Sequence, residues 1–209
     1  MILTYGAAAV IIQTLTRILF RIKIVGHQHI PKTGGFILAS NHISYYDPPL
    51  MGSFAWREMH FMAKKELFRN RIFGALISHL NAHPINRNGF DKSAIDTVVT
   101  LLKKGKNVVI FPEGTRGKGV DFLPARPGIA MIAQASGVPV VPAFISGSNH
   151  LKACFFGKMR MSIIFGPAMT ADEIAAFSRD KEGYRRLADE ILNRIRILKE
   201  DYMKSQMGH

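Results

Sequence analysis

Short, largely apolar runs of strand length alternate with stretches of helical spacing along almost the whole chain. Examples are the runs 35–39, 59–64, 108–111 and 138–145, most of them bounded by glycine or proline, as buried strands are. Between the runs, apolar residues recur every three or four positions, which is typical of helices that cover a sheet. This alternation predicts an α/β fold with a mixed, mostly buried β-sheet flanked by helices. No repeat or linker divides the 209 residues, so we expect a single domain.

The first of these runs leads into a polar turn that contains His42 and Asp47, five positions apart and just before Pro48. Histidine titrates near neutral pH, and a carboxylate at its second ring nitrogen fixes the tautomer and stabilises the imidazolium. Residues five apart on a helix point about 140° away from each other, so this pairing requires a turn. The stretch predicts a general base, His42, oriented by Asp47. The alternative is that Asp47 only caps a helix that begins at Pro48.

A second strand-like run, 108–111, also ends in a polar turn. Residues 112–116 have the sequence Pro-Glu-Gly-Thr-Arg, so one carboxylate, Glu113, and one guanidinium, Arg116, follow the end of the run. In open α/β sheets, ligands bind at the carboxyl ends of the strands. We therefore expect the two polar turns to form one site.

Together, the two turns resemble a known enzyme family. The stretches Asn41-His42-x-x-x-x-Asp47 and Phe111-Pro112-Glu113-Gly114-Thr115-Arg116 are similar, in order and in separation, to the first and third sequence blocks of the glycerolipid acyltransferases. The run Val138-Pro139-x-x-Pro142 resembles the fourth block, in which we expect the prolines to shape an acyl channel or a strand edge. The resemblance covers roughly residues 20 to 150 and implies the same α/β architecture.

For this chain the resemblance implies transfer of a fatty acyl group to the sn-2 hydroxyl of 1-acyl-glycerol-3-phosphate (lysophosphatidic acid), giving phosphatidic acid. The donor would be the thioester of acyl-CoA or acyl carrier protein. An alcohol attacks well once a base takes its proton, and a thiolate leaves readily, so we expect no covalent enzyme intermediate, cofactor or metal. The motifs define acyl transfer better than they define the acceptor. A lyso-ornithine lipid, another lysophospholipid or glycerol-3-phosphate is the alternative acceptor.

The resemblance also implies roles for individual residues. His42 and Asp47 would be catalytic. Arg116 would bind the phosphate of the acceptor, because a guanidinium matches phosphate oxygens better than an ammonium does. Glu113 would accept a hydrogen bond from a glycerol hydroxyl or position Arg116, and Gly114 would let the backbone approach the ligand. The predicted substrate-binding residues are Arg87, Glu113, Gly114, Thr115 and Arg116.

Arg87 comes from a partial match to the second block of the family. There, an arginine that contacts glycerol phosphate follows a glycine by six positions; in this chain Asn81 stands in place of the glycine, and Asn86 where aspartate is common. Asparagine tolerates a left-handed backbone better than most residues, so the substitution is compatible with the block. The other interpretation of Arg87 is a solvated surface charge.

The chain is strongly basic. Its 28 lysines and arginines exceed its 15 acidic residues by 13, which indicates an anionic partner such as nucleic acid, an acidic membrane surface or a phosphorylated ligand. The basic residues are scattered without a recognition motif, so we do not expect nucleic acid. A metal-dependent hydrolase built from His42, Asp47 and Glu113 would lack a second histidine at ligand spacing. The single cysteine, Cys154, excludes an intrachain disulfide and is typical of a reducing compartment.

Residues 1–21 are apolar but lack the leading charges and cleavage site of a signal peptide. The uninterrupted apolar run, 5–12, is much shorter than the ~20 residues that span a bilayer. We expect a helix that lies in the membrane interface, followed by an acyltransferase domain over 22–209. This would hold the enzyme on the cytoplasmic face of an acidic phospholipid membrane as a peripheral or monotopic protein. Packing of the helix on the protein's own core and a true span are the alternatives. One helical stripe carries Ile11, Leu15, Ile18 and Leu19.

Three further expectations concern local structure. Residues 67–80 have the pattern of one amphipathic helix. Thr170 and Glu173 have the spacing of a capping box ahead of a long basic C-terminal helix. His60 and His79 are expected to be exposed or to have local hydrogen-bond partners.

Overall fold

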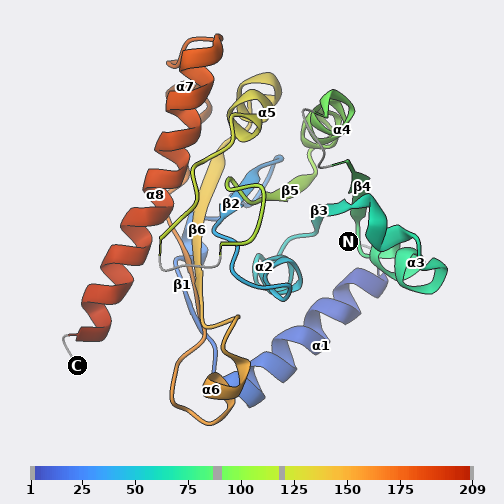
Figure 1. Cartoon of the computed structure of the whole chain (residues 1–209), viewed down its shortest axis with the longest axis vertical. Coiled ribbons are helices and arrows are strands. Elements are labelled where there is room, and N and C mark those ends of the chain that lie inside the picture. Colours follow the sequence, from blue (N-terminus) through green and yellow to red (C-terminus); the bar gives the residue numbers. More distant parts are fainter. Residues whose placement is uncertain (1–2, 87–90, 118–120, 208–209) are drawn as a thin grey trace.

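The computed structural model describes residues 3–86, 91–117 and 121–207, and it has a seven-stranded sheet at its centre (Figure 1). The strand order is β1-β7-β6-β2-β5-β3-β4, and every pairing is parallel except that of β6 with β7. The mixed sheet expected from the sequence is therefore confirmed. The strands are β1 (Lys23–Val25), β2 (Ile37–Ser40), β3 (Met59–Lys64), β4 (Ala82–Ile85), β5 (Asn107–Ile110), β6 (Val140–Ser146) and β7 (Ser162–Phe165).

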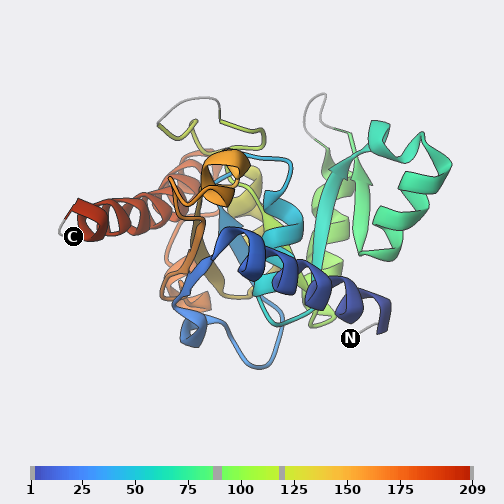
Figure 2. The ribbon, with the colours of Figure 1, turned by 90° about the horizontal axis from the view of Figure 1, so that it is seen from below.

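Helices cover both faces of the sheet. Helices α4, α5, α7 and α8 pack on one face, whereas α2 packs on the other, with α1 outside it and α6 beside α1. Figure 2 shows α8 and α3 at opposite ends of the molecule. The helices are α1 (Leu3–Phe20), α2 (Asp47–Phe54), α3 (Arg71–His79), α4 (Lys92–Lys103), α5 (Gly128–Ser136), α6 (Leu151–Phe155), α7 (Ala171–Ala175) and α8 (Lys181–Met207), with 3-10 turns η1 (His27–His29) and η2 (Lys65–Phe68).

The central strand β2 explains why the strand runs are almost continuously apolar. Ile37 and Ala39 belong to the core beneath α4, α5 and α8, whereas Phe36 and Leu38 belong to the core beneath α2, and all four are fully buried. Successive residues of a strand point to opposite faces, and here both faces are covered. A buried parallel strand therefore requires apolar residues at every position.

Parallel pairing also aligns the ends of three strands. Strand β2 lies between β5 and β6 and runs parallel to both, with Ile37 opposite Val108 and Val140. The side-chain amide of Asn41 continues the pairing beyond β2, because it donates to the carbonyl of Ile145 (3.0 Å) and accepts from the amide of Ile145 (2.8 Å). The turns that follow β2, β5 and β6 therefore meet at one edge of the sheet.

Helix α1 confirms the helix expected at the N-terminus and has two different faces. On the inner face, Tyr5 is buried and accepts a hydrogen bond from the amide of Met59 (3.1 Å), while Gln13 donates to the carbonyl of Ser53 (2.5 Å). The outer face carries the exposed residues Val10, Ile11, Leu15, Ile18 and Leu19. In the described part of the chain, no helix is both long and apolar enough to cross a membrane.

Two helix predictions need correction. Residues 67–80 do not form one helix: η2 ends at Phe68, and α3 begins at Arg71 because Asn70 caps it by accepting from the amide of Phe73 (3.0 Å). The capping box of Thr170 and Glu173 is confirmed, but it starts the short helix α7 rather than the long C-terminal helix. Helix α8 begins later, where Asp180 accepts from the amide of Gly183 (2.7 Å).

Two histidines form a pair on β3 and β4, the last two strands at one end of the sheet. His60 of β3 and His83 of β4 are joined through Nδ1 and Nε2 at 3.0 Å. One ring must donate and the other accept, which requires that the accepting nitrogen carry no proton. Burial, helped by the neighbouring His83, lowers the pKa of His60 to about 4, and burial also lowers the pKa of His83. His79, by contrast, is exposed, as expected, and is bonded to Thr4 of the distant helix α1 (2.8 Å).

Acid is predicted to destabilise the protein through this pair. In the unfolded chain these rings bind protons near pH 6.5, whereas folding keeps His60 neutral down to about pH 4. The stability is present in full above pH 6.5 and is lost as the pH falls towards 4. We expect the free energy of unfolding to fall by about 1–2 kcal/mol between pH 7 and 4.5. This loss is smaller than the full difference between the unfolded and folded pKa values would give, because the pair is partly solvated. The free energy of unfolding of His60→Asn, measured by urea denaturation, should depend less on pH than that of the wild type. An unchanged pH dependence would contradict this role of the histidine pair.

Candidate active site

The turn between β2 and α2 brings His42 and Asp47 together. Nδ1 of His42 lies 2.9 Å from Oδ2 of Asp47, and both residues are buried, Asp47 completely. Because Nδ1 is bound to the carboxylate, Nε2 is the ring nitrogen left to accept a proton. The ring of Phe111 stacks on the imidazole, with centroids 4.1 Å apart and planes inclined by 17°. The imidazole is therefore held by a hydrogen bond at one edge and by an aromatic ring on one face.

The carboxylate of Asp47 is held by four donors. Oδ2 accepts from His42 and from the amides of Ile43 (2.7 Å) and Ser44 (2.7 Å), and Oδ1 accepts from the hydroxyl of Ser148 (2.5 Å). The interpretation of Asp47 as a helix cap is wrong. The N-cap of α2 is Tyr46, which makes no side-chain capping bond, and Asp47 is the first residue of the helix with its carboxylate turned back to the preceding turn.

Glu113 joins the turn after β5 to the turn after β2. Its Oε1 accepts from the amide of His42 (3.2 Å), its Oε2 accepts from the amide of Leu123 (2.8 Å), and the residue is 3% exposed. The amide of Gly117 also donates to the carbonyl of His42 (2.9 Å). Both carboxylate oxygens thus bind backbone amides, which favours a positioning role for Glu113. Its contact with substrate stays a prediction.

Gly114 lies beneath a basic side chain. Its φ is +69°, and a Cβ atom there would lie 2.6 Å from Cδ of Arg126. Glycine is therefore required both by the left-handed backbone and by the close approach of Arg126. Among the described residues, the guanidinium of Arg126 has no hydrogen bond or ion pair. Sequence reasoning did not select Arg126 as a site residue, and its only signal was its position before the Pro127-Gly128 start of α5.

The other predicted substrate-binding residues differ in their positions. Arg116 lies over the ring of Tyr45, with Cζ 3.5 Å from the ring centre, so a cation–π contact links the two turns. Thr115 is exposed beside the candidate site. Arg87 lies outside the described residues. Asn81, at the position where the family has glycine, has a φ of 64°, which confirms that asparagine here adopts a left-handed backbone.

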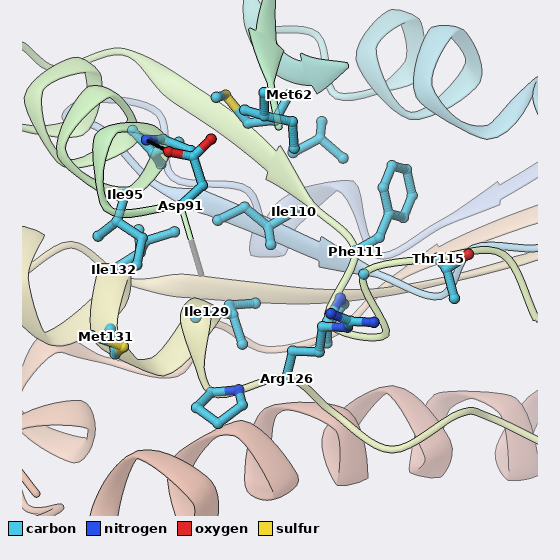
Figure 3. Close-up of a pocket in the computed structure, with 18 of the residues that line it drawn as sticks. Met62, Asp91, Ile95, Ile110, Phe111, Thr115, Arg126, Ile129, Met131 and Ile132 are labelled. Atoms are coloured by element: carbon cyan, nitrogen blue, oxygen red, sulfur yellow. Dashed lines mark hydrogen bonds between the residues drawn. The ribbon is translucent and has the colours of Figure 1, made fainter. Parts of the chain in front are cut away.

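A cavity of about 720 Å³ extends from His42 between the sheet, α4 and α5. In Figure 3, Arg126, Thr115 and Phe111 lie towards one end of it, and Met131, Ile132 and Ile95 lie towards the other. Lys64 is a further cationic residue of the lining and was not predicted. The cavity thus joins a polar end near Arg126 with a long, mainly apolar wall, and Asp91 lies beside Ile95 at the far end. The apolar wall includes Met62, Ile85, Ile95, Val98, Ile110, Ile129, Met131 and Ile132.

A base with its proton-accepting nitrogen beside an apolar cavity suits deprotonation of a hydroxyl on a lipid-like substrate. In the described part of the chain, no group of three or more histidine, cysteine or acidic residues is arranged to hold a metal ion. The pairing of His42 with Asp47 and the guanidinium of Arg126 are suited to acid–base catalysis and to the binding of an anion.

Comparisons with known proteins agree with this geometry. The family model described as "Acyltransferase" matches residues 21–146. The 1-acyl-sn-glycerol-3-phosphate acyltransferase of Bacillus subtilis (strain 168) is 32% identical over 178 residues, which cover 85% of this chain and 87% of that protein. The enzyme of the same name from Streptococcus pneumoniae is 32% identical over 169 residues, covering 79% of this chain and 61% of that protein.

A solved structure has the same fold. The crystal structure of the 1-acyl-sn-glycerophosphate acyltransferase of Thermotoga maritima matches with a TM-score of 0.71 and 26% identity, covering 94% of this chain and 78% of that one. The match extends beyond the two turns to the sheet and its helices. The chain therefore belongs to the acyltransferase family, as the resemblance of its two polar turns predicted.

Proposed function

We propose that this protein transfers a fatty acyl group from an acyl thioester to the sn-2 hydroxyl of 1-acyl-glycerol-3-phosphate, giving phosphatidic acid. The observation that carries the proposal is the position of His42, which is paired with Asp47 and lines the polar end of an apolar cavity. The names of the similar enzymes from Bacillus subtilis and Streptococcus pneumoniae support this acceptor. The donor is the thioester of acyl-CoA or of acyl carrier protein.

In the proposed reaction, Nε2 of His42 takes the proton of the acceptor hydroxyl as its oxygen attacks the thioester carbonyl. The new ester bond forms, the carbon–sulfur bond breaks, and the proton on the imidazolium passes to the departing thiolate. Asp47, bound to Nδ1, keeps the imidazole in the required tautomer and stabilises the imidazolium. No covalent acyl-enzyme is required, because a thiolate is a good leaving group.

The cavity supplies the binding sites that this reaction needs. Its apolar wall offers a place for a fatty acyl chain, and its volume of about 720 Å³ is within the usual range for ligand pockets. Arg126 offers a guanidinium to the acceptor phosphate at the polar end, with Arg116 nearby on the adjoining turn.

Other acceptors, such as a lyso-ornithine lipid, another lysophospholipid or glycerol-3-phosphate, would share the same base. A panel of these acceptors with one labelled acyl thioester, read out by product mass, tests the assignment.

The proposed function includes docking of the enzyme on an acidic phospholipid membrane, on its cytoplasmic face. Helix α1 runs between α6 and α3 (Figure 1), and the hydroxyl of Thr4 in α1 is bonded to His79 of α3 (2.8 Å). All three helices expose large apolar residues, so we call them the docking face. The exposed residues are Val10, Ile11, Leu15, Ile18 and Leu19 on α1, Ile72, Phe73 and Leu76 on α3, and Phe155 on α6 with Phe156 and Met159 just beyond it.

The charges around the docking face favour an anionic surface. Residues 3–20, 67–80 and 151–161 contain no aspartate or glutamate, and they carry several basic residues. Apolar side chains rimmed by lysine and arginine are typical of segments that lie in the interface of an acidic bilayer. Both the acceptor and the product are lipids, so docking would spare each molecule a passage through water. The basic residues are Arg17, Arg69, Arg71, Lys152, Lys158 and Arg160.

The catalytic roles predict a graded loss of activity. His42→Ala should lower kcat by about 10²–10⁴-fold, because a positioned base contributes that much, and Asp47→Asn should lower it less. Steady-state transfer from acyl-CoA to 1-acyl-glycerol-3-phosphate measures the effect, with circular dichroism to show that the variants are folded. If folded His42→Ala kept more than a tenth of the wild-type turnover, the assignment of the base would fail.

Arg126 at the polar end of the cavity and Arg116 on the adjoining turn predict a selective effect on the acceptor. Arg126→Ala and Arg116→Ala should raise KM for the phosphate-bearing acceptor about 10- to 150-fold, the equivalent of one charge-assisted hydrogen bond, with a much smaller change for the donor. Lysine should restore little, because it cannot form the paired contacts of a guanidinium. Arg179→Ala, an exposed arginine far along the chain between α7 and α8, is the control. Equal losses for donor and acceptor would indicate a structural role instead.

The docking face predicts binding to acidic vesicles. Ile18→Ser combined with Ile72→Ser should weaken binding to phosphatidylglycerol-containing vesicles at least about 10-fold, since each exposed isoleucine buries apolar surface in the lipid. Ile197→Ser combined with Met203→Ser, exposed positions on α8, is the matched control and should bind as the wild type does. Activity on a short-chain, water-soluble acceptor should be unchanged in both. Undiminished binding of the first variant in a co-sedimentation assay would refute this docking face.

A further inference from the structure

Ser148 touches the proposed catalytic pair from a distant part of the sequence. Its hydroxyl donates to Oδ1 of Asp47 at 2.5 Å, although 101 positions separate the two residues. Neither residue has measurable solvent exposure. A hydroxyl and a carboxylate buried together without access to water depend on each other for hydrogen bonding. The four sequence blocks that carry the family resemblance end before Ser148 and gave it no role.

The two oxygens of Asp47 are bound very unequally. Oδ2 accepts from Nδ1 of His42 and from the amides of Ile43 and Ser44, whereas the only donor to Oδ1 among the described residues is Ser148. The rotation of a carboxylate about its Cβ–Cγ bond is soft, so a hydrogen bond to the second oxygen restrains it further. Ser148 supplies that restraint at Oδ1 and thereby helps to keep Oδ2 directed at the imidazole.

The loop that carries Ser148 is itself held firmly. Strand β6 is tied to the β2 turn by Asn41, which exchanges two hydrogen bonds with Ile145 (3.0 and 2.8 Å). Gly147 has a φ of +82°, and a Cβ atom there would lie 3.0 Å from Cα of Met161, so the loop packs closely against the start of β7. The hydroxyl of Ser148 is thus delivered to Asp47 by a rigid part of the fold.

We propose that Ser148 is a positioning residue of the acyltransferase, which acts on catalysis through the orientation of the Asp47 carboxylate. This inference rests on the proposed roles of His42 and Asp47. Ser148 is not among the residues that line the cavity, and its hydroxyl bonds to Asp47 and not to the imidazole. It sets the direction of the carboxylate that holds Nδ1 of His42, and so keeps Nε2 aimed at the acceptor hydroxyl.

Ser148→Ala tests the inference by removing the hydroxyl and nothing else. We expect kcat to fall about 10-fold or more, since a hydrogen bond to a charged group is lost, while KM for the acceptor and for the donor stays near the wild-type value. Ser162→Ala is the matched control, because Ser162 is equally buried on the neighbouring strand but its hydroxyl bonds to Tyr202 (3.3 Å) and not to the Asp47 carboxylate. It should leave kcat unchanged.

A double-mutant cycle separates positioning from a general effect on the fold. In an Asp47→Ala background the carboxylate is absent, so removing Ser148 should cause no further loss of kcat. An equal loss in both backgrounds would mean that Ser148 supports the loop and not the carboxylate, and the inference would be wrong. The downfield Nδ1 proton of His42 in the NMR spectrum should also shift or broaden in Ser148→Ala and be unchanged in Ser162→Ala.

Two further measurements keep the outcome decisive. If Ser148→Ala does not fold, Ser148→Cys supplies a side chain of similar size that donates only weakly, and it should show the same selective loss of kcat. Activity of His42→Ala is measured in parallel. An active His42→Ala would overturn the proposed mechanism itself, whereas an inactive His42→Ala with fully active Ser148→Ala would overturn the role of Ser148 alone.

Discussion

The buried carboxylate of Asp47 is the constraint on which the site depends. A charge without solvent access is tolerated only when hydrogen bonds replace the water it has lost, and here four donors do so. Three come from the turn after β2, and the fourth comes from the loop after β6. The arrangement therefore requires that β2 and β6 end side by side, which their parallel pairing and the amide of Asn41 provide.

A second buried carboxylate extends the same principle to β5. Glu113 accepts from the amides of His42 and Leu123, so it fastens the turn after β5 to the backbone of the base and to the segment that leads to α5. Arg126, farther along that segment, then lies over Gly114 at the polar end of the cavity. Two carboxylates that never face solvent thus define the positions of a base, an arginine and the cavity between them. A surface ion pair would give much weaker control, because water competes for both partners.

The sequence predicted those features that local pattern determines. Strand runs, helical spacing and the capping box of Thr170 all depend on residues near each other in the chain, and the pairing of His42 with Asp47 spans only five positions. The left-handed conformation at Asn81 was compatible with the sequence, because asparagine tolerates this backbone and stands where the family has glycine. The contacts of Ser148 and Arg126 were not predicted, since each depends on which strands become neighbours. Glu113 was recognised from its motif, yet its amide partners could be identified only in the folded chain.

Composition alone does not determine what the apolar side chains of a helix contact, and helix α1 is an example. Its sequence offers more apolar residues than one face of a helix can bury, and the fold uses Tyr5, Ile12 and Thr16 for contact with its own domain. The stripe of Ile11, Leu15 and Ile18 is left facing outwards, at 57%, 51% and 69% exposure. An enzyme that meets its substrates in water would gain nothing from these side chains, which add apolar surface without adding core. Their cost is offset if the helix rests on a bilayer, and the inner-face hydrogen bonds of Tyr5 and Gln13 would then hold the rest of the domain, and with it the cavity, in a fixed orientation to the lipid.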